Sequence, residues 1–384
     1  MLYDWANSAF WTTVVTAVFP VYFIDLAREL GRERATERFT QATTLALIVS
    51  ALVAPVLGSL ADFRALKKTM LGAFALLGSL ATAALFFALP GDWLFALVCF
   101  ALGNVGAAAS TAFYDALLPH VAREGEMDRL SSSGFAIGYL GGGLCLALNL
   151  AVILRPQWFG LPYGDGLTPA QATLPVRVAL LTVGLWWLVF TLPLLLRVKE
   201  PPRLLESDEN AGASVLKVSF QRLGETLREL RRYRQAFTLL IAALIFNDGI
   251  QTVLRMAALY AAAKDLDRGV VVGTFLAVQF VGIPCAFGFG ALAERFGTKL
   301  MVVTGLATFC LISVLAYFMS ATWHFVALGL LVALVQGGTQ ALTRSMFASL
   351  VPRAQFGEIF IKRGLVTDAG GMMILPRLVG PQKA

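Results

Sequence analysis

The sequence predicts an all-α integral membrane protein built from two repeated halves. Three observations support this fold class: 58% of the residues are hydrophobic and 14% are charged, the apolar residues form about ten long runs, and one short loop occurs twice. Soluble domains carry about 25% charged residues. A chain this apolar needs lipid to cover much of its surface, which excludes an ordinary soluble protein.

Ten apolar runs are long enough to cross a bilayer, which takes about 20 mostly apolar residues. The runs cover approximately residues 5–25, 40–61, 69–89, 93–118, 131–154, 175–197, 236–259, 269–292, 299–319 and 323–350. The first run has no basic segment before it and no small-residue cleavage site after it. We therefore expect a retained span rather than a signal peptide.

A short loop follows an apolar run in each half of the chain. Residues 58–62 read Gly-Ser-Leu-Ala-Asp, and residues 290–294, which begin 232 positions later, read Gly-Ala-Leu-Ala-Glu. Basic residues follow both copies. Pro119 and Pro352 follow the fourth and tenth runs at nearly the same offset. Repeats of this kind are typical of secondary transporters built from duplicated helical bundles.

The chain divides into four segments. Residues 1–197 hold six runs and residues 236–360 hold four. Between them, residues 198–235 form a cytoplasmic linker that ends in an amphipathic stretch. We expect that stretch to be a helix lying on the membrane face or packed on the protein itself. Residues 361–384 form an aberrant tail in which the pattern ends without another span.

The distribution of basic residues predicts the orientation. Most of the 31 Lys and Arg residues fall in the segments that are cytoplasmic if residue 1 is inside. Basic residues mark the cytoplasmic side, so both termini are predicted to be cytoplasmic. The net charge of +7 is explained in this way, and we expect no nucleic-acid partner.

Nothing in the sequence predicts a metal site, a cofactor or an enzyme. The four cysteines lie inside apolar runs without close spacing, and His120 and His324 are far apart. An integral-membrane enzyme would need a nucleophile or metal constellation near buried carboxylates. The pairing of Asp115 with His120 is a weak basis for one, because the two residues lie at interfacial depth.

One run carries charged residues at mid-bilayer depth, where a charge is costly and usually functional. Asp248 lies about 18 Å into the seventh run at 1.5 Å per residue, and Gln251 and Arg255 follow on the same helical face. We predict that these residues and Asn7, in the opposing first run, bind a solute. The alternative is an internal network that only satisfies buried charge.

Two further runs carry polar stripes. Gln336, Gln340 and Arg344 are spaced i, i+4 and i+8 in the tenth run, and the two glutamines are predicted to contact solute. Arg344 either continues that stripe or snorkels to the cytoplasm. Asp4 begins the first run, where a gating role and a solvated or capping carboxylate are both open.

Glycines recur in the fifth run. Gly134, Gly138 and Gly142 form two overlapping GxxxG steps. Such steps permit close packing of helices in membranes, and a conformational hinge is the alternative.

Several motifs resemble one transporter family. Residues 3–10 read Tyr-Asp-Trp-Ala-Asn-Ser-Ala-Phe, residues 113–119 read Phe-Tyr-Asp-Ala-Leu-Leu-Pro, and residues 247–252 read Asn-Asp-Gly-Ile-Gln-Thr. Together with the repeated loop, they resemble the vacuole-effluxer family of the major facilitator superfamily. The resemblance implies a major facilitator-type bundle of twelve spans in two six-helix halves. It also implies amino-acid export.

The chain departs from that family at three places. We count about ten spans, arranged as six plus four, so the last two of twelve are expected to be missing. Tyr139 stands where the antiporter glycine motif has proline. Asn104 lies near the position where many proton-coupled relatives carry arginine, so the resemblance does not predict proton coupling.

The repeated loop resembles the superfamily's loop between spans two and three, which implies a gate. In this interpretation Gly58 and Gly290 permit close packing at the helix ends. Asp62 and Glu294 hold backbone N–H groups or an arginine across the interface between the halves. Lys67, Arg295 and Asp115 complete the predicted gating set; alternatively, each loop is a charged turn that only sets topology.

The sequence as a whole predicts a secondary transporter of a small polar solute that works by alternating access, and the resemblance implies amino-acid export. We expect a monomeric multi-pass protein of the bacterial inner membrane whose partners are a solute and the lipid bilayer. The main alternative is a truncated, nonfunctional transporter remnant. An integral-membrane enzyme is the remaining alternative.

Overall fold

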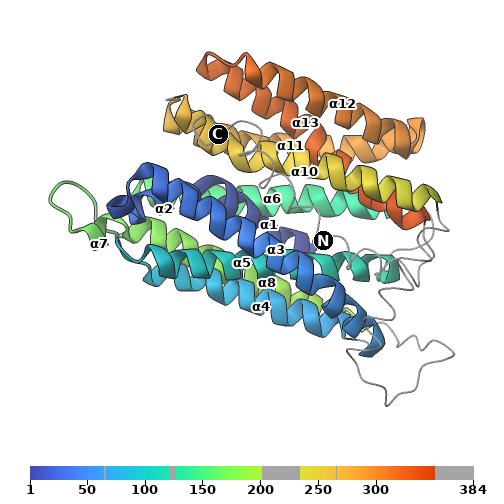
Figure 1. The fold of residues 1–384 in the computed structure, drawn as a ribbon, viewed down its shortest axis with the longest axis horizontal. Helices are drawn as coiled ribbons and strands as arrows, with labels where there is room; N and C mark the ends of the chain where they lie inside the picture. Colours follow the sequence, from blue (N-terminus) through green and yellow to red (C-terminus); the bar gives the residue numbers. More distant parts are fainter. Residues whose placement is uncertain (65, 122–126, 201–233, 265, 351–384) are drawn as a thin grey trace.

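A computed structural model describes residues 1–64, 66–121, 127–200, 234–264 and 266–350, and the regular secondary structure in these ranges is entirely helical. The long helices lie side by side in one bundle (Figure 1). Helices α1 to α8 form one group, and α10 to α13 form another. Helix α6 (Met127–Leu154) lies between the groups and packs on both.

The first half contains six long helical segments. The first segment is continuous through α1 (Leu2–Ala9), η1 (Phe10–Val18) and α2 (Phe19–Leu26). The others are α3 (Arg32–Arg64), α4 (Lys67–Ala84) with η3 (Leu85–Phe87), α5 (Trp93–Val121), α6 and α8 (Leu174–Arg197). Short turns η2 (Arg28–Leu30), η4 (Pro156–Phe159) and α7 (Pro169–Ala172) lie in the connections.

The second half contributes four described helices: α10 (Arg234–Ala263), α11 (Arg268–Phe296), α12 (Thr298–Tyr317) and α13 (Thr322–Leu350). Within the described ranges, nine helices are long and apolar enough to cross a membrane. The remaining predicted run, 40–61, falls inside α3, a helix of 33 residues. The all-helical membrane fold predicted from the sequence is therefore confirmed.

The core of the first half is aromatic. Trp187 of α8 is fully buried, and its ring contacts Phe10 of the first segment at a centroid distance of 5.3 Å. A Cβ added to Gly78 would lie 2.3 Å from the Trp187 ring, so only glycine lets α4 approach α8 this closely. Aromatic burial of this kind supplies much of the packing energy of a helical core.

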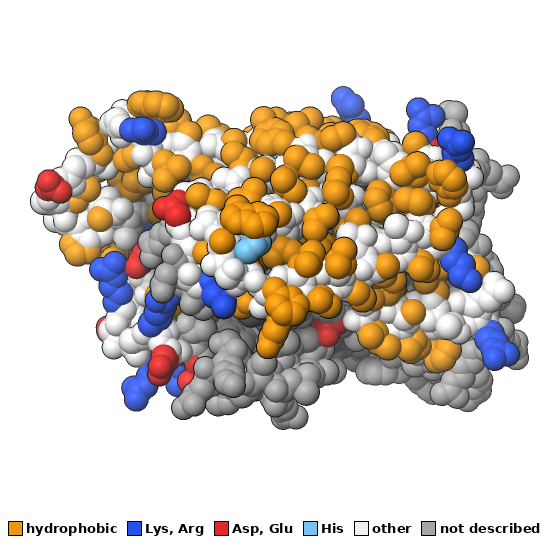
Figure 2. Space-filling view, turned by 90° about the horizontal axis from the view of Figure 1, so that it is seen from above, with side chains coloured by type: hydrophobic (Ala, Val, Ile, Leu, Met, Phe, Trp, Pro, Cys, Tyr) orange, Lys and Arg blue, Asp and Glu red, His pale blue; other side chains and the backbone are white. Residues whose placement is uncertain are grey.

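The outer surface is apolar along the middle of the bundle. Figure 2 shows hydrophobic side chains over the centre of one face, with Lys and Arg gathered toward its ends. Ile245 of α10 is 72% exposed, and the side chains of Tyr317 and Phe318 at the end of α12 are exposed to a similar extent. This pattern fits a bundle whose flanks contact lipid and whose ends contact water.

The first segment contains a nine-residue π-helix, η1, that the sequence analysis did not predict. The hydroxyl of Thr16 donates to the carbonyl of Trp11, five residues earlier, at 2.9 Å. Pro20 follows in α2 and has no backbone N–H to continue an α-helical ladder. π-helical turns inside membrane helices are frequent at functional sites.

Glu200, which follows α8, is hydrogen-bonded to the start of α4 in the same half. Its carboxylate accepts hydrogen bonds from the backbone N–H of Lys68 at 2.9 and 3.1 Å, and so caps the start of α4. The Lys68 ammonium donates to the carbonyl of Val198 at 3.1 Å. The predicted linker helix and the aberrant tail lie outside the described residues.

Candidate functional site

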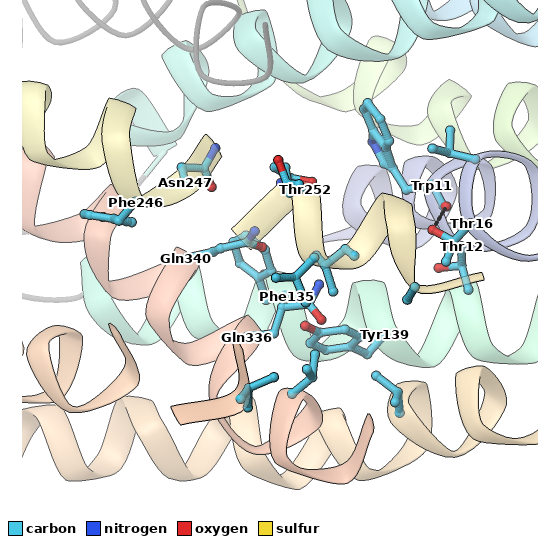
Figure 3. A pocket seen from close by; sticks show the side chains of 18 of the residues that line it. Trp11, Thr12, Thr16, Phe135, Tyr139, Phe246, Asn247, Thr252, Gln336 and Gln340 are labelled. Carbon is cyan, nitrogen blue, oxygen red and sulfur yellow. Dashed lines mark hydrogen bonds between the residues drawn. The ribbon is translucent and has the colours of Figure 1, made fainter. Parts of the chain in front are cut away.

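A central cavity of about 770 Å³ lies between the two halves. The first segment, α5 and α6 line it from one side, and α10, α11, α12 and α13 line it from the other. Figure 3 shows polar and aromatic side chains from both groups pointing into the space. The site is therefore shared between the halves, as the predicted duplication requires.

Carboxamide side chains dominate the polar part of the wall. The set comprises Asn7, Asn247, Gln251, Gln279, Gln336 and Gln340. Aromatic side chains lie among them, including Trp11 of η1 and Phe246 of α10. Charged residues in the described lining are limited to three: Asp4, Asp115 and Arg344.

The three charged residues lie at one end of the cavity. The Arg344 guanidinium of α13 donates to the Asp115 carboxylate of α5 at 2.5 Å, and both residues are 7% exposed. Arg344 Nε also donates to the Ser131 hydroxyl of α6 at 2.9 Å. One arginine from the second half is thus held by two helices of the first half.

Two more hydrogen bonds join the halves at this end. The Ser131 hydroxyl donates to the carbonyl of Ala341 at 2.9 Å, and the Thr298 hydroxyl donates to the Asp128 carboxylate at 3.1 Å. Together with the Asp115–Arg344 ion pair, they join the two halves at this end of the cavity. We call this set of contacts the latch.

The first segment is fixed to α5 beside the latch. The hydroxyl of Tyr114 donates to the Asp4 carboxylate, and the Asn7 amide donates to the Thr111 hydroxyl at 2.5 Å. The Asn7 side-chain oxygen is buried and has no hydrogen-bond partner among the described residues. An acceptor of this kind is open to a solute donor or a water molecule.

The glycine stripe of α6 lets the first segment approach closely. A Cβ on Gly138 would lie 2.6 Å from Ser8 Oγ, and a Cβ on Gly142 would lie 2.8 Å from Thr12 Oγ1. On Gly134 it would lie 2.8 Å from Asp4 Oδ2. The sequence-based interpretation of this stripe as a close-packing surface therefore agrees with the geometry.

Tyr139 of α6 is wedged between two helices of the other half. Its ring lies against Gly282 of α11 and Gly337 of α13, where added Cβ atoms would be 3.2 and 2.5 Å from ring carbons. This residue replaces the proline of the antiporter motif that the sequence resembles. Here it fills notches made by glycines of α11 and α13.

The structure brings most of the predicted solute-contact residues together. Asn7, Gln251, Gln336 and Gln340 all line the cavity. Asp248 is partly buried and is absent from the lining set, in which its neighbour Asn247 takes part. The side chain of Arg255 is outside the described part of the chain, so its predicted contact with solute stays a prediction.

The predicted gating residues fall into three groups. Asp4 and Asp115 lie beside each other at the latch, and Gly290 packs against Ser132, with 3.0 Å between an added Cβ and the hydroxyl. Lys67 is buried, whereas Glu294 and Arg295 are exposed. The packing of Gly58 and the side chain of Asp62 lie outside the described part of the chain. Arg344 does not snorkel to water: that alternative is wrong, because the side chain is buried and paired.

Sequence reasoning missed five side chains of the latch and its surroundings: Thr111, Tyr114, Asp128, Ser131 and Thr298. Tyr114 lies inside a quoted motif but carried no predicted role. Ser131 and Thr111 are common small polar residues in apolar runs, and no spacing marks them. Among the described residues, no group of three or more His, Cys, Asp or Glu side chains is placed to hold a metal ion.

Comparisons with known proteins give a family and a fold. A family model described as "Vacuole effluxer Atg22 like" matches residues 39–379. The uncharacterized MFS-type transporter YxiO of Bacillus subtilis is 33% identical over 362 residues, which cover 94% of this chain and 82% of YxiO. Autophagy-related protein 22-1 of Aspergillus niger is 27% identical; the match covers 66% of this chain and 42% of that longer protein.

Solved structures of the major facilitator superfamily share the fold. The proton:xylose symporter XylE has a TM-score of 0.63 at 13% identity, covering 98% of this chain and 86% of XylE. A bacterial homologue of the iron transporter ferroportin has a TM-score of 0.63 at 15% identity, with coverage of 100% and 91%. At these identities the likeness concerns the fold alone.

Proposed function

The chain belongs to the vacuole effluxer Atg22-like family and is a multi-pass transporter of the major facilitator superfamily, and from this premise we propose that it carries a small polar solute through the central cavity by alternating access. The observation that carries the proposal is the cavity itself. Both halves line it, and a buried ion pair joins the halves at one end. Transporters of this architecture bind solute between repeats that rock against each other.

The latch supplies the two-state element that alternating access requires. Opening it separates Arg344 from Asp115 and exposes both charges to water. Breaking a buried pair without such solvation costs about 3–5 kcal/mol, so the closed arrangement is well defined. A solute shifts the balance between the two states only by binding them with different affinity.

We further propose that the latch faces the cytoplasm. It lies at the start of the first segment and at the end of α13, on the side where most Lys and Arg residues of the loops occur. Basic loops mark the cytoplasmic side. The described state is then closed toward the cytoplasm in a bacterial inner membrane, with both termini inside.

Amino-acid export is the specific activity that the resemblance implies. An amino acid needs an acceptor for its ammonium group and a cation for its carboxylate. In the described lining, Asp4 is a candidate acceptor, and Arg344 is the candidate cation once it leaves Asp115. Export of an amino acid would therefore use the latch itself as part of the site.

Site-directed cysteine labelling tests alternating access without knowledge of the solute. In a cysteine-free background, Thr343→Cys probes the latch end of the cavity, and Ser313→Cys probes the opposite part, near the end of α12. A membrane-impermeant thiol reagent should label Ser313→Cys and leave Thr343→Cys protected. Adding Asp115→Asn should raise labelling of Thr343→Cys and lower labelling of Ser313→Cys.

A charge-neutral change outside the cavity provides the control. Gln157→Asn in the exposed turn η4 should leave both labelling rates unchanged. If the two positions respond to Asp115→Asn in the same direction, the halves do not rock about the cavity. An unresponsive protein would instead fit the alternative of a nonfunctional remnant.

A further inference from the structure

We infer that the solute is an uncharged, polyhydroxylated molecule, a monosaccharide or a sugar alcohol, held by carboxamides of both halves. The inference rests on the proposed transport function and specifies its substrate class. It comes from the hydrogen-bonding capacity of the cavity, the position of its charges and the arrangement of its aromatic rings.

Five carboxamides of the cavity have hydrogen-bonding capacity that the described residues do not use. Between described residues, no hydrogen bond involves the side chains of Asn247, Gln251, Gln279, Gln336 or Gln340. Each carboxamide offers two N–H donors and an acceptor oxygen. Five such groups in one cavity present both donors and acceptors, which is what a solute with several hydroxyl groups needs.

The hydroxyl side chains of the wall contribute less donor capacity. Thr252, Ser313 and Thr343 each donate to a carbonyl of their own helix, at 2.9, 3.0 and 2.7 Å. Their oxygens remain acceptors, but their protons are committed to the helix. The described lining therefore offers amide N–H groups as donors, together with the hydroxyls of Ser8, Thr12 and Tyr139, which donate no hydrogen bond between described residues; both kinds of donor bind hydroxyl oxygens.

The charges of the cavity are concentrated in the latch and are already engaged. Arg344 is paired with Asp115, and Asp4 accepts a hydrogen bond from Tyr114. The rest of the described lining is uncharged. Against these described residues, a charged solute would lose its hydration without gaining a counter-charge, which is costly, whereas a neutral polyol exchanges water hydrogen bonds for amide hydrogen bonds.

Aromatic and amide side chains form two adjacent rows beside the latch. Phe135 and Tyr139 are one turn apart on α6, and Gln336 and Gln340 are one turn apart on α13. Tyr139 lies against Gly337, next to Gln336, and the Phe135 ring lies 5.0 Å from the guanidinium of Arg344, one turn after Gln340.

The two rows therefore run side by side, and Figure 3 shows Gln336 close to Phe135 and Tyr139. A sugar ring has apolar C–H faces and polar hydroxyl edges. Its C–H faces pack on aromatic rings while its hydroxyl groups bond to neighbouring carboxamides. Concave sites with aromatic walls and a few oriented polar groups are how proteins bind small molecules.

Thermal unfolding of the purified full chain in detergent tests the substrate class. Aldopentoses, aldohexoses and their sugar alcohols are compared with neutral, acidic and basic amino acids and with nucleosides, each up to about 10 mM, above the common KM range. A bound solute raises the unfolding temperature in a saturable way. At least one polyol should do so.

Variants of the amide row identify the site. Gln336→Ala and Gln340→Ala should each lower the affinity for that polyol by about tenfold or more, because each leaves hydroxyl groups of the solute unpaired. Gln157→Ala, at the exposed turn η4, is the matched control and should leave affinity unchanged. Two separate variants are used so that the test still holds if one of them fails to fold.

The outcomes separate the inference from the proposed function. Saturation by amino acids or nucleosides but by no polyol, or no saturable shift with any polyol, overturns the inference. Polyol binding that both glutamine variants leave unchanged also overturns it. If reciprocal cysteine labelling persists in these cases, transport still stands and only the substrate class is wrong; if labelling is not reciprocal, the transport proposal fails independently.

Discussion

The ion pair between Asp115 and Arg344 is where single residues control the state of the molecule. The two side chains come from different halves, and both are almost fully buried. Ser131 and the ring of Phe135 complete the surroundings of the guanidinium. A buried charge that loses its partner is far more costly than the loss of both charges together.

This asymmetry predicts the outcome of a double-mutant cycle. Asp115→Asn and Arg344→Gln alone should each lower the unfolding temperature markedly, corresponding to about 3–5 kcal/mol for an uncompensated buried charge. The double variant should recover much of that loss, since no charge is left unpaired. Thermal unfolding in detergent measures all four proteins.

An additive double variant would contradict the pairing in the folded protein. The control is the exposed pair of Asp25 and Arg28, whose atoms are 3.1 Å apart in contact with solvent. Removing either of these side chains should change stability by less than about 1 kcal/mol.

Sequence reasoning placed residues on the cavity wall where polarity inside an apolar run was informative, and their role in solute binding stays a prediction. Gln336 and Gln340 were visible because an i, i+4 polar stripe stands out in a span, and Gln251 for the same reason. Asp115 was placed correctly at a helix end, but its partner was not, since pairing between distant helices leaves no local pattern. Asp248 was expected in the cavity from its depth and from the helical face that it was predicted to share with Gln251, but neither fixes which way its side chain faces.

At the scale of single elements, the first segment departs most from expectation. Its apolar run predicted an ordinary spanning helix, and the structure has α-helix, π-helix and α-helix in succession. The π-helical part carries Trp11, Thr12 and Thr16 on the cavity wall. The wider turn sets which face of the segment meets the solute.

The Thr16 hydroxyl is predicted to support this π-helical turn. Thr16→Val keeps the shape of the side chain but removes the donor to the Trp11 carbonyl. We expect a loss of about 1 kcal/mol in stability, together with weaker solute binding because Trp11 and Thr12 shift. Thermal unfolding with and without solute measures both effects.

Thr304 on the lipid-facing side of α12 supplies the matched control. Its hydroxyl donates to the carbonyl of Leu300, four residues earlier, as in an ordinary α-helix, and the side chain is exposed. Thr304→Val should leave solute affinity unchanged. Equal effects of the two substitutions on affinity would show that the π-helical turn has no special role.

The spans themselves were predictable because membrane insertion imposes a simple rule. The bilayer requires long apolar helices, and every predicted run corresponds to a helix whose ends differ from the prediction by a few residues, apart from the extended start of α3. The π-helix was not predictable, because apolar periodicity does not distinguish i→i+4 from i→i+5 hydrogen bonding.

At the scale of the whole molecule, duplication predicted the site between the halves but not the contacts that hold them. The second copy of the repeated loop places Glu294 and Arg295 on the surface, whereas the latch contacts come from α5, α6, α13 and Thr298 at the start of α12. Close approach depends on Gly282 and Gly337 around one tyrosine. Such three-body packing cannot be read from a single sequence.

The side of the membrane on which the latch lies decides whether the described state is closed to the cytoplasm or to the outside. In intact bacterial cells that express a cysteine-free background, an impermeant maleimide should label Asp165→Cys, in the exposed loop before α7. Lys299→Cys, at the exposed start of α12, should label only after permeabilisation. Basic loops near the latch predict this result by the positive-inside rule. The reverse pattern would place the buried Asp115–Arg344 pair at the outer surface, so that the described state would be closed to the outside and open to the cytoplasm.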